Sequence, residues 1–372
     1  MLGLFPRKPR LIVHSEAPYN AEPDLARLGG AFLTDAADFY VRSHGDIPTI
    51  EAEAYRLRVE GAVTLPLDLS LADLKGRFPE VEVTAAMQCA GNRRSDLLPV
   101  RPVSGDPWAA GAIGNARWTG VRLADVLAAA GPAPAAIPLA DRHVAFESHD
   151  TVEGEGGRFP FGASIPMAKA LAPETLLAWA MNGAALAPEH GHPLRVVVPG
   201  FAGVRSPKWL ARVTVQDRPS DNPMQAQDYK LYPPHVTAET ADPAQGHTIE
   251  GMPLTSAICA PARGAGLAVG THAIRGYAIA GDRTIARVDV SGDGGRSWTQ
   301  ARLSYPGEAG APRSPWAWTL WDCALALAPG EHELAVRAWD AAGQTQPALP
   351  DDTWNHKGYL SAAWHRVRVT VA

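Results

Sequence analysis

A single cysteine followed by two adjacent arginines is the part of this sequence best suited to chemistry. The stretch AAMQCAGNRRSD (85–96) places Cys89 at the end of an apolar run, and a Gly-Asn turn then leads to Arg93 and Arg94. A thiolate is a soft ligand that suits a thiophilic metal, and arginine forks bind oxyanions through paired hydrogen bonds. The pattern indicates a metal–thiolate site for an oxyanion. A lone cysteine is more often a small buried hydrophobe, and adjacent arginines are often solvated, so the residues alone leave both interpretations open.

A strand is needed to position this cysteine. Residues 81–88 alternate, with Val81 and Val83 on one face and Glu82 and Thr84 on the other, which is the period of a β-strand. Such a strand delivers Cys89 to its C-terminal edge, where ligands commonly bind in α/β folds.

The bulk composition limits the class of protein. A length of 372 residues predicts two domains, and a formal charge of −5 gives no support for nucleic-acid binding. The cysteines are too few and too scattered for a disulfide framework or an iron–sulfur cluster: Cys89, Cys259 and Cys323. No signal peptide and no apolar run long enough to span a membrane is evident, so we expect a cytoplasmic protein without membrane contact.

The first part of the chain is expected to mix helices and strands. TGVRLADVLAAAG (119–131) predicts a helix capped by Thr119 and ended by Gly131, and SLADLKGRF (70–78) predicts a shorter helix capped by Ser70. LRVVVPG (194–200) and KWLARVTV (208–215) are typical of strands.

The last 125 or so residues have a different pattern, that of an all-β domain. Short strands are predicted at 272–280, 285–291, 297–303, 332–340 and 364–371, and SGDGG (291–295) predicts a hairpin turn. In the last strand Val367, Val369 and Val371 alternate with polar residues. A polar, Pro- and Gly-containing stretch near 240–250 predicts domains at 1–242 and 243–372, the second a β-sandwich.

A series of motifs, in order along nearly the whole chain, resembles the sulfite oxidase family. The motifs are FYVRSH (39–44), QCAGNRR (88–94), GAIGNARWTGVRLADVL (111–127), FGASIPMAKAL (161–171), PEHGHPLRVVVPGFAGVRSPKWL (188–210), DYK (228–230), RVDVSGDGGRSW (287–298), WAWTLW (316–321) and WNHKGYLSAAWHRV (354–367). The resemblance implies an α+β protein. A mixed α/β domain would bind a molybdenum–molybdopterin cofactor, and an immunoglobulin-like sandwich after it would form a homodimer.

The resemblance also assigns site residues. It implies that Cys89 is the protein ligand to molybdenum. Contacts to the pterin and its phosphate are implied for Tyr40, Arg42, Ser43, His44, Asp150, His190, Arg195, Ser206 and Lys208. Beside Cys89, the catalytic and substrate-binding residues implied are Arg42, Arg94, Trp108, Tyr229 and Lys357.

Two positions depart from the family pattern. Lys357 stands where the family has a substrate-facing arginine, and Ser43 replaces an asparagine common in the family. Lysine keeps the positive charge but loses the planar fork, so we expect weaker or less orientation-specific anion binding.

The activity implied is oxidation of sulfite to sulfate by oxygen-atom transfer. Its electrons would pass to a separate acceptor, a cytochrome or dioxygen, because no haem, flavin or nicotinamide module is evident in the sequence. Reduction of nitrate or an S-oxide on the same fold stays an alternative, as does a non-catalytic scaffold. A zinc hydrolase built on His190 and His192 lacks a third ligand at a fitting spacing.

Overall fold

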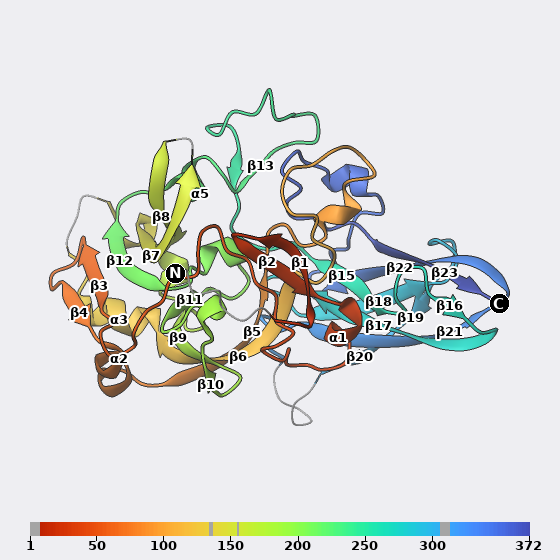
Figure 1. Ribbon diagram of the computed structural model, residues 1–372, viewed down its shortest axis with the longest axis horizontal. Coiled ribbons are helices and arrows are strands. Elements are labelled where there is room, and N and C mark those ends of the chain that lie inside the picture. Colours follow the sequence, from red (N-terminus) through yellow and green to blue (C-terminus); the bar gives the residue numbers. More distant parts are fainter. Residues whose placement is uncertain (1–7, 134–136, 155, 306–312) are drawn as a thin grey trace.

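The structure, a computed structural model, describes residues 8–133, 137–154, 156–305 and 313–372. It consists mostly of strands, and α3 (Leu123–Ala130) is the longest helix in the described ranges. A broad N-terminal part and an elongated C-terminal part lie end to end (Figure 1). Within these ranges no helix has the length and apolar character needed to cross a membrane.

The predicted strand before Cys89 is confirmed as an edge strand of the first sheet. In spatial order the sheet contains β10 (Ala184–Ala185), β9 (Leu176–Met181), β6 (Ile113–Arg122) and β5 (Val81–Gln88), with β11 (Arg195–Val197) paired to β9. Both faces of β5 become buried toward Gln88. The backbone N–H of Ala86 donates to the carbonyl of Trp316 at 2.8 Å, so the C-terminal part covers the edge of this strand.

A second sheet completes the N-terminal part. Its strands are, in spatial order, β4 (Leu67–Leu69), β3 (Leu57–Gly61), β12 (Leu210–Gln216), β7 (His143–Gly154) and β8 (Gly157–Pro166). The main core lies between the two sheets and is closed by apolar residues of α2 (Leu71–Arg77) and α3, such as Leu74, Val126 and Leu127. The strands expected at 194–200 and 208–215 are therefore observed, the first shortened to β11.

The two helix predictions had different outcomes. Ser70 caps α2, and its side chain and that of Asp73 bond each other's backbone N–H groups, which is a capping box. The predicted cap of α3 is wrong: Thr119 lies in β6, and the helix begins only after Arg122. Pairing of β6 with both β5 and β9 decides this boundary. The backbone N–H and C=O groups near Thr119 already form hydrogen bonds with the neighbouring strands, so the helix cannot begin there. Gly131 ends the helix as expected, with φ of +64°.

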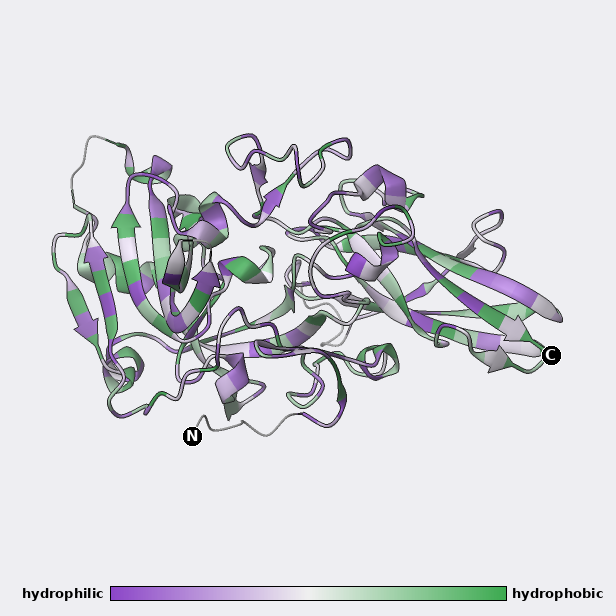
Figure 2. Ribbon diagram, turned by 45° about the horizontal axis from the view of Figure 1, so that its top comes forward, coloured by the Kyte–Doolittle hydropathy of each residue, from purple (hydrophilic) through white to green (hydrophobic). Residues whose placement is uncertain are grey.

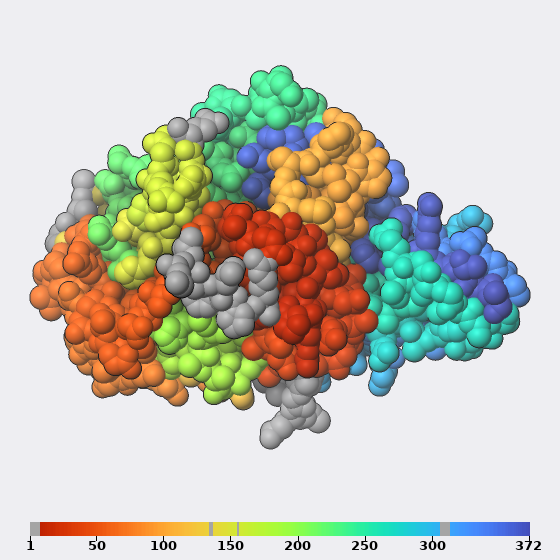
Figure 3. Space-filling view, in the orientation of Figure 1, coloured from red at the N-terminus to blue at the C-terminus, as the bar shows by residue number. Residues whose placement is uncertain are grey.

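Short elements connect these sheets and cover them. They are β1 (Leu11–Glu16), β2 (Tyr19–Pro23), α1 (Leu25–Leu28), η1 (Arg94–Asp96), η2 (Leu139–Asp141), α4 (Met167–Ala170), η3 (Pro188–His190), η4 (Gly203–Arg205), α5 (Pro223–Ala226), β13 (Lys230–Leu231), β14 (His247–Thr248) and η5 (Pro350–Thr353). The hairpin β1–β2 lies at the surface between the two parts of the molecule (Figure 3).

The C-terminal part is built from two sheets that enclose a core of aliphatic side chains and Trp321. One contains β15 (Thr255–Ala260), β17 (Gly270–Ile279), β21 (Thr319–Leu327) and β20 (Arg302–Ser304). The other contains β16 (Gly266–Leu267), β23 (His365–Val371), β22 (Gly330–Asp340), β18 (Ile285–Ser291) and β19 (Thr299–Gln300). Each predicted strand region contains observed strands, and the valines of β23 point inward as expected. Hydrophobic and hydrophilic residues alternate along these strands (Figure 2).

Candidate active site

One cavity gathers every residue that the sequence predicted to contact the cofactor. Its non-protein space, including the part that is open to solvent, amounts to about 650 Å³. The predicted residues that line it are Tyr40, Arg42, Ser43, His44, Cys89, Asp150, His190, Arg195, Ser206 and Lys208, and the predicted catalytic Tyr229 joins them. They come from the segment after β2, the end of β5, strand β7, and the segments around η3 and η4.

Cys89 lies directly after β5 at the wall of this cavity. Its backbone N–H bonds the carbonyl of Ala112 at 2.9 Å, and its Sγ accepts from the N–H of Gly91 at 3.4 Å. Burial raises the pKa of the thiol, and the nearby charges of Arg42 and Arg94 oppose this rise. The net shift is upward, so Cys89 without a metal stays a thiol, and the two cations favour the thiolate once a metal replaces the proton.

Arg195 and Lys208 form a buried cationic end of the cavity. Arg195 donates to the carbonyls of His190 and Ser206, each at 3.0 Å, and Lys208 donates to the Ser43 hydroxyl at 3.0 Å. Burial lowers the pKa of Arg195 to about 10 and that of Lys208 to about 7. Among the described residues neither cation has a carboxylate within ion-pair distance. The charges of Asp150 and Glu189 act on Lys208 only from beyond ion-pair distance, and buried cations that lack a contacting carboxylate favour an anionic ligand.

Asp150 and the two cavity histidines add groups that suit a heterocyclic ring. One oxygen of the Asp150 carboxyl is buried without a hydrogen-bond partner, and burial raises the pKa of this group to about 6. Burial and neighbouring cations lower the pKa of His44 and of His190 well below the usual range, so both are neutral at neutral pH. Neutral imidazoles and an unpaired carboxyl oxygen can bind the N–H and carbonyl groups of a ring.

Tyr229 and Arg42 lie on the side of the cavity nearest Arg94. The Tyr229 hydroxyl lies 2.7 Å from Nε2 of His44. The guanidinium of Arg42 donates to Asn20 at 3.3 Å, and Asn20 in turn donates to the Asp106 carboxylate at 3.0 Å. Asn20 thus orients Arg42.

Glycines make room for the guanidinium of Arg94. A Cβ at Gly91 or Gly105 would lie 2.7 Å from its terminal nitrogens, and a Cβ at Gly358 would lie 2.6 Å from its Cγ. The guanidinium donates to the carbonyl of Asp106 at 2.8 Å and to that of Lys357 at 3.1 Å. These contacts hold Arg94 in one place, at the junction of the N-terminal part with the segment 354–364.

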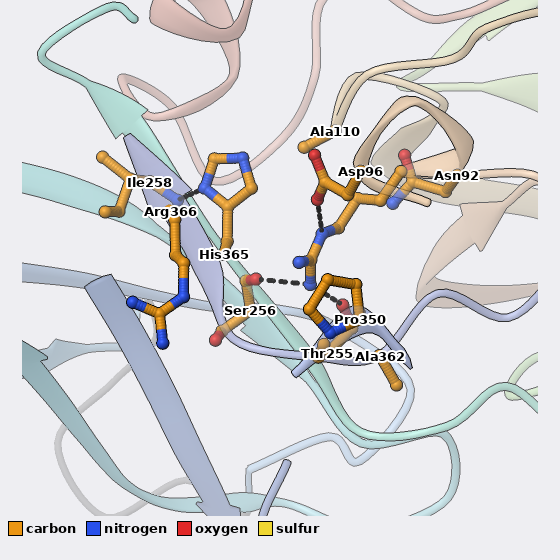
Figure 4. A network of polar contacts seen from close by, with 12 residues as sticks. Asn92, Asp96, Ala110, Thr255, Ser256, Ile258, Pro350, Ala362, His365 and Arg366 are labelled. Atoms are coloured by element: carbon orange, nitrogen blue, oxygen red, sulfur yellow. Dashed lines mark hydrogen bonds and ion pairs between the residues drawn. The ribbon is translucent and has the colours of Figure 1, made fainter. Parts of the chain in front are cut away.

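The position of Arg93 beside Arg94 indicated anion binding, but in the structure Arg93 makes hydrogen bonds within the protein. It is buried, bonds Asp96 at 2.9 Å, and donates to the carbonyl of Ser256 at 3.2 Å. Asp96 lies on one side of the Arg93 guanidinium, and Thr255 and Ser256 lie on the other (Figure 4). Arg93 therefore links the loop after Cys89 to β15 of the C-terminal part.

Three predicted substrate residues lie outside the lining of the cavity: Arg94, Trp108 and Lys357. Trp108 is fully buried, with its ring edge-on to His14 at 4.8 Å and its N–H without a partner. The ammonium of Lys357 lies 2.9 Å from the carboxylate of Asp228, and both side chains are about one-third exposed. Their substrate roles stay predictions.

Some residues around the cavity were not predicted from the sequence. The ammonium of Lys8 lies 2.5 Å from Nε2 of His190 and 3.2 Å from the carboxylate of Glu189. Asn20 was missed as well. No local motif marks these positions, because their contacts join segments far apart in the chain.

The cavity fits a molybdenum–molybdopterin cofactor. Cys89 offers one soft ligand, and the described residues contain no group of three or more His, Cys, Asp or Glu side chains that could hold a metal. A cofactor that brings its own metal ligands, as the family resemblance implies, would complete such a site. The unpaired oxygen of Asp150 suits the pterin ring, and the cations Arg195 and Lys208 suit its phosphate.

Comparison with known proteins agrees with this site. Residues 44–224 match the oxidoreductase molybdopterin binding domain, and residues 246–372 match the Mo-co oxidoreductase dimerisation domain. Sulfite oxidase of Gallus gallus is 45% identical over 97% of this chain and 78% of its own length. Sulfite oxidase of Arabidopsis thaliana is 39% identical over 97% of this chain and 94% of its own length.

A solved structure shares the fold. The sulfane dehydrogenase SoxCD of Paracoccus pantotrophus superimposes with a TM-score of 0.76 at 26% identity, covering 97% of this chain and 89% of that chain. The two domains and the cavity define a molybdopterin-dependent oxidoreductase. The chain belongs to the sulfite oxidase family.

Proposed function

We propose that this protein oxidises sulfite to sulfate by oxygen-atom transfer. The observation that carries the proposal is the placement of Cys89 in one cavity with Arg42 and the buried cations Arg195 and Lys208, while the charge of Arg94 also acts on the thiol. The similarity to sulfite oxidases over almost the whole chain supports the same substrate.

The cofactor is held by the residues of the cavity. Cys89 binds the metal, Arg195 and Lys208 bind the phosphate, and Asp150 and His190 contact the pterin ring. Tyr40, Ser43, His44 and Ser206 complete the contacts to the cofactor. When bound, the molybdenum centre supplies the oxygen atom and accepts the two electrons of the reaction.

The side chains near Cys89 bind and orient the substrate. Sulfite is present as monoanion and dianion near neutral pH, and Arg42 and Arg94 offset that negative charge in a partly dry site. The Tyr229 hydroxyl donates to the anion, with His44 as its alternative partner. Trp108 acts from behind the cavity wall, as part of the cluster of buried residues that also contains Cys89.

Lys357 contributes less than the two arginines. Its ammonium is already paired with Asp228, and both groups are partly exposed to solvent. It lacks the planar fork of arginine, so the protein holds sulfite less tightly than a relative with arginine at this position.

Several wider properties belong to the same proposal. The catalytic domain comprises residues 1–242, and residues 243–372 form an immunoglobulin-like sandwich that joins two copies into a homodimer, as the match to a dimerisation domain supports. The protein works in the cytoplasm. It passes electrons to a separate carrier such as a cytochrome, or to dioxygen.

The decisive experiment combines metal analysis with an activity assay. Purified protein is expected to contain about one molybdenum per chain, and to reduce ferricyanide when sulfite is added. The Tyr305→Phe variant serves as a control. The hydroxyl of Tyr305 bonds the carbonyl of Ile285 in the C-terminal part, and neither residue lines the cavity, so the variant should keep both molybdenum and activity. Molybdenum-loaded protein that reduces nitrate or an S-oxide and leaves sulfite unchanged would refute the proposal.

A further inference from the structure

Tyr359 is placed beside the substrate side of the cavity by a pinned loop. The side chain of Asn355 bonds both the N–H of Tyr359, at 3.0 Å, and its carbonyl, at 2.7 Å. The N–H of Leu360 donates to the carbonyl of Ala90, the residue after Cys89, at 2.8 Å. Gly358 has φ of +62°, so the loop can turn here close to Arg94.

The buried ring of Tyr359 touches two of the residues assigned to the substrate. It stacks on the ring of Tyr229 with centroids 5.0 Å apart and an interplanar angle of 13°. The guanidinium carbon of Arg94 lies 5.4 Å from its centroid. The Tyr359 hydroxyl donates to the carboxylate of Asp228 at 3.3 Å.

Tyr229 needs such support because of its backbone. It has φ of +41°, a left-handed conformation that costs a non-glycine residue on the order of 1 kcal/mol or more. Its carbonyl accepts from the N–H of Ile249 at 3.0 Å, and the stacked ring of Tyr359 covers one face of its side chain. Through Asp228, Tyr359 also holds the residue directly before Tyr229.

We propose that Tyr359 is a positioning residue of the substrate site, which holds the Tyr229 hydroxyl where it meets the oxyanion. The inference rests on the proposed function and deepens it. Tyr359 acts through Tyr229, so its effect on anion binding depends on the Tyr229 hydroxyl being present.

The test is a double-mutant cycle on the molybdenum-loaded protein. Tyr359→Leu removes the ring and the hydroxyl, Tyr359→Phe removes the hydroxyl alone, and each is combined with Tyr229→Phe. The measurements are KM and kcat for sulfite and, independently of turnover, the Kd of sulfate by calorimetry. Tyr305→Phe is again the control for loss of a phenol hydrogen bond elsewhere.

We expect Tyr359→Leu to raise the sulfite KM and the sulfate Kd by about tenfold and to change kcat by less than about threefold. In the Tyr229→Phe background the same change should have less than about a twofold effect. Equal effects in both backgrounds, or none in either, would overturn the inference.

Three further outcomes also decide between the inference and its alternatives. If Tyr359→Leu loses molybdenum or melts much earlier, Tyr359→Phe carries the test, with about a threefold effect that disappears with Tyr229→Phe. If the wild-type protein oxidises no sulfite, the proposed function fails and the sulfate cycle still decides the role of Tyr359. Wild-type protein that neither oxidises sulfite nor binds sulfate would overturn both.

Discussion

Arg93 and Arg94 are neighbours in the chain, yet their guanidinium groups serve different parts of the molecule. Arg93 bonds Asp96 and the carbonyl of Ser256 at the junction with the C-terminal part, whereas Arg94 bonds the carbonyls of Asp106 and Lys357 beside the cavity. The left-handed backbone of Arg93, with φ of +66°, turns the chain between them.

The two arginines are therefore expected to give different phenotypes. Arg94→Gln should raise the KM for sulfite by about 30-fold or more, since truncating a buried charged partner of an anion costs about 2–5 kcal/mol. Arg93→Gln should leave KM within about twofold and lower the free energy of unfolding by about 3 kcal/mol, because it strands Asp96. Steady-state kinetics and urea denaturation separate the two, and equal KM effects would contradict this division.

The role of Cys89 predicts a loss of chemistry without a loss of fold. Cys89→Ser replaces a small buried side chain by another of similar size, so the melting temperature should change by only a few degrees. Molybdenum-dependent turnover should fall by about 1000-fold or more, because a neutral hydroxyl is a poor replacement for a thiolate ligand. Calorimetry and the sulfite assay test this together, and wild-type activity in Cys89→Ser would refute the metal assignment.

Lys208 predicts a pH-dependent uptake of the cofactor. Burial, followed by repulsion from Arg195, lowers the pKa of its ammonium to about 7, so the cation is lost as pH rises above that value. Above about pH 7 the phosphate of the cofactor is already dianionic, and a bound dianion raises the pKa of Lys208. As the pH rises above about 7, the affinity of cofactor-free protein for molybdopterin should therefore fall by up to about tenfold per pH unit.

The matched variant is Lys208→Arg, which keeps its charge across this range. Association measured by the fluorescence of the pterin should lose most of its pH dependence in this variant. A slope that persists unchanged would show that another group controls uptake.

His365 predicts acid sensitivity of the junction between the two parts. Its Nδ1 accepts from the N–H of Ile258 at 3.1 Å, and burial lowers its pKa to about 4. Between about pH 6.5 and pH 4 the unfolded chain binds a proton that the folded chain does not, so stability falls as the pH decreases. The loss amounts to about 3 kcal/mol at most.

The control is His365→Asn, whose side-chain carbonyl can accept the same N–H without titrating. Urea denaturation at about pH 7 and about pH 5 should show a smaller decrease for the variant than for the wild type. Equal decreases would place the acid sensitivity elsewhere.

Local sequence determined much of the scaffold. The alternation of residues 81–88 predicted β5, the Ser70 signal predicted the cap of α2, and the valines of β23 face the core as expected. These features depend on neighbours within a few residues, so the alternation of a strand and the cap of a helix can be recognised in the sequence. The motif resemblance supplied the residues of the cavity, which composition and spacing alone could not.

The tertiary structure alone decided how the chain closes around Cys89. Pairing of β6 with β5 and β9 displaced the expected cap at Thr119. Lys8 reaches His190, and Tyr359 stacks on Tyr229, across more than a hundred residues in each case. Such contacts depend on which surfaces pack together, and packing depends on the whole fold rather than on any local pattern.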